Sequence, residues 1–203
     1  VLVMLGVEGE IPELAHHNLL FSDDWSDDFD AVFNGPVASR PQAASQSIYV
    51  SKPSATDPSV APAGHENLFV LVPVPADPSV GHGDMYRGEA SEQVQRIADA
   101  AIEQIAARCG VAGLGRRIVV KQTLGPADFA ERYNAWSGGS IGPAHTLRQS
   151  AFLRGSNKSR KLDTLMYAGT TTTPGVGVPM CLISAENVLK RVRGDRSSGP
   201  LDH

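Results

Sequence analysis

Cysteine is scarce in this chain of 203 residues, where it occurs only as Cys109 and Cys181. Two such residues form neither a disulfide framework nor a metal site, so a reducing, cytoplasmic setting is expected. The sequence also lacks a CxxC pair, a Walker motif and a Ser–His–Asp order. It therefore gives no sign of dithiol redox chemistry, nucleotide hydrolysis or triad-based acyl transfer.

Long apolar runs and a strong charge of one sign are absent as well. No stretch approaches the roughly 18 uninterrupted apolar residues of a transmembrane helix. The formal net charge is only −4, which does not favour nucleic acid or an anionic membrane as a main partner. A hydrophobic content of 41% over this length is typical of a globular protein with one sizeable core.

Local patterns predict an α+β fold with a mixed or antiparallel sheet. Strands are expected at 1–7, 17–21, 47–51, 67–74 and 117–123, the last of them antiparallel to 67–74. Apolar residues at i, i+3, i+4, i+7 spacing predict a helix from about Gly88 to Cys109, which Gly110 ends. Pro126 suits the first turn of a short helix that continues to Tyr133.

The acidic stretch from Ser22 to Asp30 leaves two alternatives open. Its five aspartates could bind a divalent cation, or they could form a solvated turn that leads into a short helix. The stretch lacks the glycine and terminal glutamate of a calcium loop, which favours the turn. No metal site is therefore predicted.

The segment near the C-terminus carries the most specific pattern. A short strand at 164–168 is expected to lead into Gly169, and the glycine-rich turn PGVGVP follows at 174–179. An amphipathic helix should begin near Met180, with its apolar side formed by Leu182, Ala185, Val188, Leu189 and Val192. Glycine lets a backbone approach a ligand, and free N–H groups at a helix start attract an anion. The alternative is an ordinary strand–turn–helix connection.

Five motifs in order resemble the CrtI-type carotenoid (phytoene) desaturases, over about residues 14–193. They are HNLLF with Trp25, YVSKPS with TDP and AP, LGPADF at 124–129, GSIG with HTLRQSAFLR at 139–154, and Gly169 with PGVGVP and SAENVLKRV. In that family the last motif contacts a flavin.

The resemblance implies FAD as the cofactor. It places Gly169 near the ribityl–phosphate region and the 176–179 backbone near the isoalloxazine; the implied cofactor residues are Gly169, Pro174, Gly175, Val176, Gly177, Val178, Pro179 and Met180. Two alternatives stay open for a run of four polar residues: His145, Arg148, Gln149 and Arg154. Their side chains either line the cavity mouth or contact the cofactor, or else they form structural hydrogen bonds and surface charge. No catalytic base is assigned.

The GxGxxG fingerprint that holds the FAD pyrophosphate is missing. We therefore expect this chain to be the C-terminal part of a larger enzyme, whose N-terminal half would carry that motif. Residues 1–160 are expected to form part of the domain that binds substrate and covers the isoalloxazine, 161–193 the last strand–turn–helix of the FAD domain, and 194–203 a disordered tail. The chain alone should bind FAD weakly or not at all and be inactive.

The implied reaction is dehydrogenation of a long polyene hydrocarbon such as phytoene in carotenoid biosynthesis. Because such a substrate dissolves in lipid, peripheral membrane association is expected, and surface left exposed could support a homodimer. Two alternatives stay open. One is a related flavoprotein: a carotenoid isomerase, a ketolase or a retinol-saturase-like enzyme. The other is a non-catalytic module for apolar-ligand binding or assembly, without flavin.

Overall fold

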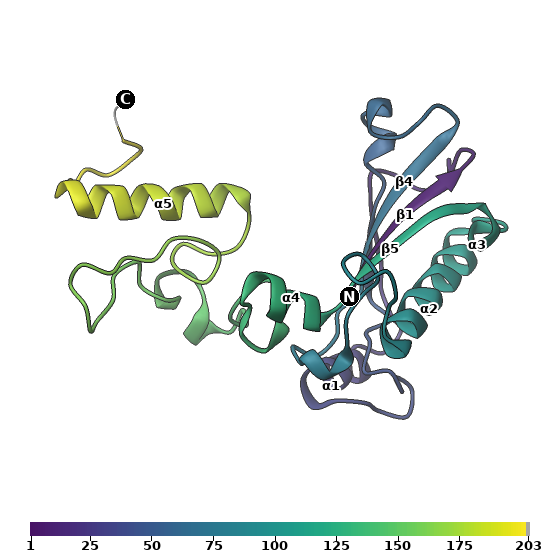
Figure 1. Ribbon diagram of the computed structural model, residues 1–203, viewed down its shortest axis with the longest axis horizontal. Helices are drawn as coiled ribbons and strands as arrows, with labels where there is room; N and C mark the ends of the chain where they lie inside the picture. The colour runs from purple at the N-terminus through teal and green to yellow at the C-terminus, as the bar shows by residue number, and fades with distance from the viewer. Residues whose placement is uncertain (202–203) are drawn as a thin grey trace. The chain divides into compact units, whose positions relative to one another are not determined.

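The computed structural model describes residues 1–201 and divides the chain into two compact units, Val1–Gly139 and Ser140–His203 (Figure 1). The boundary between the units lies earlier than the expected boundary at 160–161. Which parts of a larger enzyme the two units represent stays a prediction. Helices and an antiparallel sheet occur together, so the expected α+β class is confirmed.

The first unit is built on a five-stranded antiparallel sheet. Its order is β2 (His17–Leu20), β3 (Ile48–Ser51), β4 (His65–Leu71), β1 (Leu2–Glu8) and β5 (Ile118–Leu124). The expected pairing of the last strand with 67–74 is wrong, because β1 lies between β4 and β5 and pairs with both. Val3, Leu5 and Val7 alternate along β1 and are buried. Such alternation indicates a strand with one buried face, but it does not indicate which strands pair with it.

Helix α2 (Glu92–Cys109) covers one face of this sheet (Figure 1). The predicted apolar stripe is confirmed: its buried residues are Val94, Ile97, Ala98, Ala101, Ile102 and Ile105. They join the inward side chains of β1, β3 and β4 in one hydrophobic core. Gly110 ends the helix in the left-handed conformation, at φ 73°, which glycine adopts at little cost.

Three further helices complete the first unit: α1 (Trp25–Asn34), α3 (Leu114–Arg117) and α4 (Pro126–Tyr133). The carboxylate of Asp24 accepts hydrogen bonds from the first backbone N–H groups of α1, which confirms a turn leading into a helix. Pro126 begins α4, as predicted. The buried Asp128 accepts hydrogen bonds from the backbone N–H groups of Gly125 and Gly83 and so anchors the start of α4.

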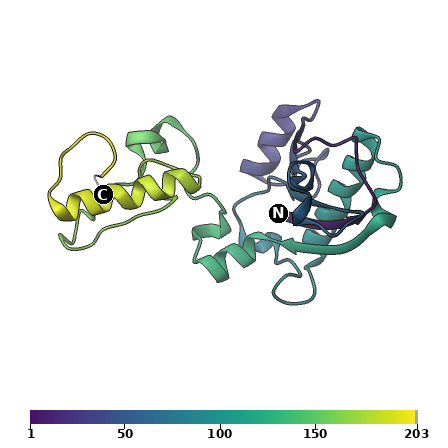
Figure 2. The same cartoon turned by 90° about the horizontal axis from the view of Figure 1, so that it is seen from above.

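The second unit contains one long helix, α5 (Val178–Arg193), beside irregular loops (Figure 2). The expected strand at 164–168 is wrong, since Met166 makes only an isolated bridge to Lys158. The backbone groups of a strand form hydrogen bonds with a neighbouring strand. Here the carbonyl of Tyr167 accepts a hydrogen bond from the side-chain amide of Asn157 instead. The tail from Gly194 to Leu201 is irregular; its disorder stays a prediction, and 202–203 lie outside the described residues.

Helix α5 begins two residues before the expected start, with Pro179 in its first turn. Its apolar side is largely exposed: 68% of Leu182 and 67% of Val192 are accessible. The one fully buried residue of α5 is polar, Ser184, with 0% exposure. This helix is therefore held to its own unit by hydrogen bonds more than by apolar contact.

Candidate functional site

The glycine turn before α5 leaves its backbone open on one side. Gly169 has φ 121° and Gly177 has φ 113°, conformations that residues with a side chain rarely adopt. Among residues 1–201, a Cβ at Gly169 would meet no heavy atom within 4 Å, and one at Gly177 would meet only Cδ of Pro179, at 3.9 Å. The space in front of both residues is therefore available to a ligand.

Backbone donors without an acceptor in residues 1–201 lie at the start of α5, directly after this turn. No side chain in the described part of the chain caps the helix, and Pro179 has no N–H group. The N–H groups of Val178 and Met180 donate to no atom among residues 1–201, whereas that of Cys181 bonds the carbonyl of Gly177. Free N–H groups and the helix dipole together favour negative charge at this point.

A buried polar cluster fixes the turn from behind. The hydroxyl of Ser184 accepts a hydrogen bond from the N–H of Gly169 at 3.1 Å and one from the amide of Asn157 at 3.0 Å. It also shares a hydrogen bond of 2.8 Å with the hydroxyl of Thr172. These bonds join the chain before the turn, the chain after it and the 155–157 loop.

Sequence reasoning missed this cluster. The one available signal was a serine at position 184 within a predicted helix, which required a polar partner once buried. Nothing in the sequence identified Asn157 as that partner, because it lies 27 residues away.

Arg154 is buried, with 4% exposure, and binds backbone carbonyl groups. Its Nε donates to Thr170 at 2.8 Å, and its Nη2 donates to Ile141 at 3.1 Å. No carboxylate pairs with it within the described part of the chain. This geometry matches the structural alternative, in which Arg154 ties the 141–149 loop to residue 170, and a cofactor contact stays a prediction.

The other three polar residues of that group, His145, Arg148 and Gln149, are exposed on the loop that Arg154 holds. Their side chains form no hydrogen bond with any residue from 1 to 201. They are therefore free to contact a ligand, and their predicted role at a cavity mouth remains untested.

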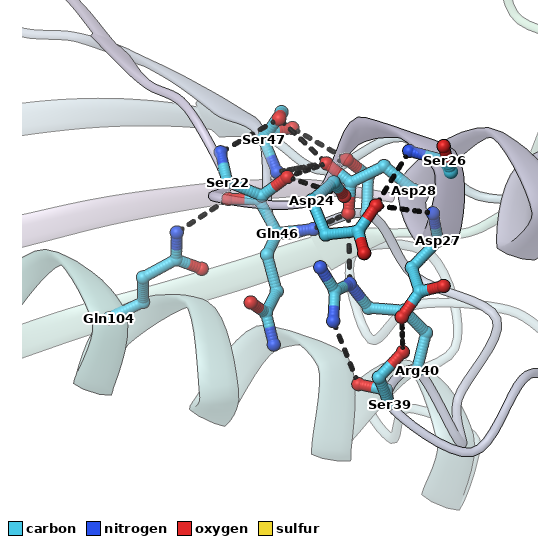
Figure 3. Close-up of polar contacts among 11 residues, drawn as sticks. Ser22, Asp24, Ser26, Asp27, Asp28, Ser39, Arg40, Gln46, Ser47 and Gln104 are labelled. Carbon is cyan, nitrogen blue, oxygen red and sulfur yellow. Dashed lines mark hydrogen bonds and ion pairs between the residues drawn. The ribbon is translucent and has the colours of Figure 1, made fainter.

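In the first unit, the acidic stretch forms a buried network around Asp28 (Figure 3). Its carboxylate accepts five hydrogen bonds, from the hydroxyls of Ser22 and Ser47, the backbone N–H groups of Gln46 and Ser47, and Nε of Arg40 at 2.9 Å. Burial by itself would raise the pKa of Asp28, but the hydrogen bonds outweigh it and hold this pKa well below its usual range. No group of residues from 1 to 201 is arranged to hold a metal ion.

Helix α1 and the preceding Phe21 also present a row of exposed aromatic rings. Phe21 stacks on Trp25 with centroids 5.4 Å apart, and the row continues through Phe29 to Phe33 at 6.3 and 6.2 Å. Between 48% and 69% of each of these side chains is exposed. An apolar row of this kind is suited to a ligand or partner that offers few hydrogen bonds.

Comparison with known proteins gives a consistent result over nearly the whole chain. The chain is 45% identical over 194 residues to a carotenoid 3,4-desaturase of Haloarcula japonica. The aligned residues cover 96% of this chain and 36% of that protein. The chain is homologous to a segment of the carotenoid desaturases. It is also 33% identical over 192 residues to a zeta-carotene-forming phytoene desaturase of Myxococcus xanthus, covering 94% of this chain and 35% of that protein.

A third desaturase relative is the 4,4'-diapophytoene desaturase (4,4'-diaponeurosporene-forming) of Staphylococcus aureus, 32% identical over 199 residues. These cover 98% of this chain and 38% of that protein. This desaturase-like chain thus spans a little over a third of the length of the curated relatives it matches. No protein-family model matches it.

Proposed function

We propose that this chain contributes the flavin-covering and C-terminal parts of an enzyme that dehydrogenates a long polyene hydrocarbon. The similarity to carotenoid desaturases over 96% of the chain carries the proposal. The relatives named above are desaturases, which favours this reaction over carotenoid isomerisation or ketone formation. The remaining part of such an enzyme would supply the dinucleotide-binding motif GxGxxG that this sequence lacks.

The proposed cofactor is FAD, which when bound supplies the hydride acceptor for the reaction. The residues present suit it, because Gly169 and Gly177 leave open space where a Cβ would otherwise project. The unpaired N–H groups of Val178 and Met180 would orient an electron-rich edge of the ring system and stabilise negative charge on it. Behind them, the hydroxyl of Ser184 keeps the turn in this conformation.

The proposed substrate is a phytoene-like polyene, which offers no hydrogen bonds. Its affinity must come from burial of apolar surface, at about 25 cal/mol per Å². The aromatic row from Phe21 to Phe33 is the largest set of adjoining exposed rings in the described chain and would form part of an apolar wall. Within residues 1–201, none of the helices combines the length and the hydrophobicity that a membrane-crossing segment requires.

Because the substrate is lipid-soluble, we propose peripheral association with the cytoplasmic face of a membrane. A homodimer would cover part of the exposed apolar surface of α5, where 68% of Leu182 is accessible. The competing hypothesis is a flavin-free module that binds an apolar ligand. Flavin retention separates the two.

The test measures flavin absorbance after incubation with FAD and desalting. It is applied to the 203-residue chain alone and to the chain combined with the N-terminal segment of the Haloarcula relative. The chain alone should retain little flavin and the combined protein should retain it. Gly177→Ala should reduce retention, since a side chain there strains the backbone and enters the open space.

Gly194→Ala is the matched control. Gly194 also has a positive φ, 70°, but it lies at the opposite end of α5 and so should leave flavin retention unchanged. A combined protein that is folded by circular dichroism yet colourless would contradict the proposal and favour the flavin-free module.

A further inference from the structure

Charge is distributed very unevenly between the two units. Residues 140–203 contain nine Lys and Arg against four Asp and Glu, whereas residues 1–139 contain nine against eighteen. The small overall charge of −4 therefore conceals a second unit of net charge +5 and a first unit of −9. Such asymmetry favours an anionic partner for the second unit alone.

Four cations of the second unit that are exposed or half-buried line one open cavity of about 990 Å³. Lys158, Arg160, Lys161 and Arg191 all line it. Lys158 pairs with Asp163 at 2.9 Å, whereas the other three form no ion pair with any residue from 1 to 201. This cavity thus presents three uncompensated positive charges to solvent.

Exposed apolar side chains border the same cavity. Phe152 and Leu153 line it and are 86% and 56% exposed, and they lie in a short turn that follows the one containing Leu147. A small soluble anion would have no use for this apolar border. Cations beside exposed Phe and Leu are instead the combination that binds an anionic lipid surface, where the apolar groups enter the boundary below the headgroups.

We propose that Phe152, Leu153, Arg160, Lys161 and Arg191 form a docking surface for an anionic phospholipid bilayer. Phe152 and Leu153 enter the headgroup–acyl boundary, and the three cations contact lipid phosphates. This inference deepens, and in that sense rests on, the peripheral association proposed above. Its residues are distinct from the glycine turn that is proposed to hold the flavin.

The experiment is co-sedimentation of the full chain with vesicles of phosphatidylcholine, with and without phosphatidylglycerol, over a range of salt concentrations. Binding should require phosphatidylglycerol and weaken with salt. The double variant Arg160→Glu, Lys161→Glu should lower affinity about 30-fold or more, since each cation near an anionic surface contributes about 5-fold. Phe152→Ser should weaken binding to the same vesicles at every salt concentration.

The matched control is Arg108→Glu, Arg116→Glu, which makes the same charge change at exposed residues of the first unit that form no ion pair within residues 1–201. It should bind vesicles like the unmodified chain, and circular dichroism checks that both double variants fold. Undiminished binding of the Arg160/Lys161 variant would overturn the proposal. Equal binding to pure phosphatidylcholine, or competition by inorganic pyrophosphate with no vesicle binding, would also overturn it.

A final variant, Leu182→Ser, tests the exposed side of α5 as the competing surface. If it abolishes vesicle binding while the Arg160/Lys161 variant does not, the apolar side of α5 around Leu182 is the membrane contact and the proposal fails. Flavin retention of the combined protein is measured on the same variants. Loss of vesicle binding with normal flavin retention separates a failure of docking from a failure of the proposed enzymatic function.

Discussion

Replacement of Ser184 by alanine tests whether the buried polar cluster fixes the glycine turn. Ser184 has 0% exposure, and its hydroxyl contacts Gly169, Asn157 and Thr172. In the Ser184→Ala variant, the N–H of Gly169 has no acceptor, whereas the side-chain amide of Asn157 keeps its hydrogen bonds to the carbonyls of Tyr167 and Thr173. The main cost is therefore one unsatisfied backbone donor at the turn.

The expected size of the effect follows from that unsatisfied donor. Leaving a buried hydrogen-bonding group without a partner costs about 1–3 kcal/mol. If this cost falls on local opening of the turn, amide exchange there accelerates by about 5- to 150-fold, since about 1.4 kcal/mol corresponds to a factor of ten. The acceleration should be confined to the second unit, because the hydrogen-bond partners of Ser184 are Asn157, Gly169 and Thr172. No residue of the β-sheet is among these partners.

Hydrogen–deuterium exchange followed by mass spectrometry measures this directly on peptides covering residues 155–173. Peptides from β1 and β4 serve as internal references. Asn187→Ala is the matched control, because Asn187 lies on the same helix and its side chain bonds no residue from 1 to 201. Unchanged exchange at 155–173 in Ser184→Ala would refute the reasoning, as would an equal acceleration in Asn187→Ala.

Two further predictions concern the first unit, whose unfolding by urea can be followed by tryptophan fluorescence because both tryptophans belong to it. Asp28→Asn should destabilise this unit by about 3–5 kcal/mol at pH 7, because it leaves the buried guanidinium of Arg40 without its carboxylate partner. The control Asp23→Asn, at an exposed residue, should destabilise it by less than about 0.5 kcal/mol. Since the folded pKa of Asp28 is depressed, its contribution is complete above the unfolded pKa of about 3.9 and is lost as pH falls below it; a difference that stays constant down to pH ~2 would contradict this. Gly83→Ala should destabilise the unit by about 1–3 kcal/mol or more, because the new Cβ would lie 1.9 Å from the backbone oxygen of Thr123, whereas Gly115→Ala, which meets nothing within 4 Å, should not destabilise it.

Part of the candidate site follows from sequence alone. The glycine turn and the helix after it were predicted, and the positive φ angles of Gly169 and Gly177 explain why glycine stands at both positions. The strand expected before the turn was wrong, since residues 164–168 have no neighbouring strand within residues 140–201. The Ser184–Asn157 contact could not be predicted, because it joins residues that are distant in sequence.

The acidic stretch of the first unit shows the same division. Its sequence indicated a turn into a short helix, which α1 confirms. It did not indicate that Asp28 alone would be buried among the aspartates and paired with Arg40. Burial there depends on the 39–47 loop folding over α1, and that loop has no periodic pattern of its own.

By itself, the sequence determined the α+β class, the apolar stripe of α2, the start of α4 and the glycine turn before α5, because each depends on residues within a few positions of one another. The tertiary structure decided the placement of β1 between β4 and β5, the buried networks of Asp28 and Ser184, and the gathering of Arg160, Lys161 and Arg191 around one cavity. These features arise from contacts between distant segments, so local propensity and periodicity carry no information about them.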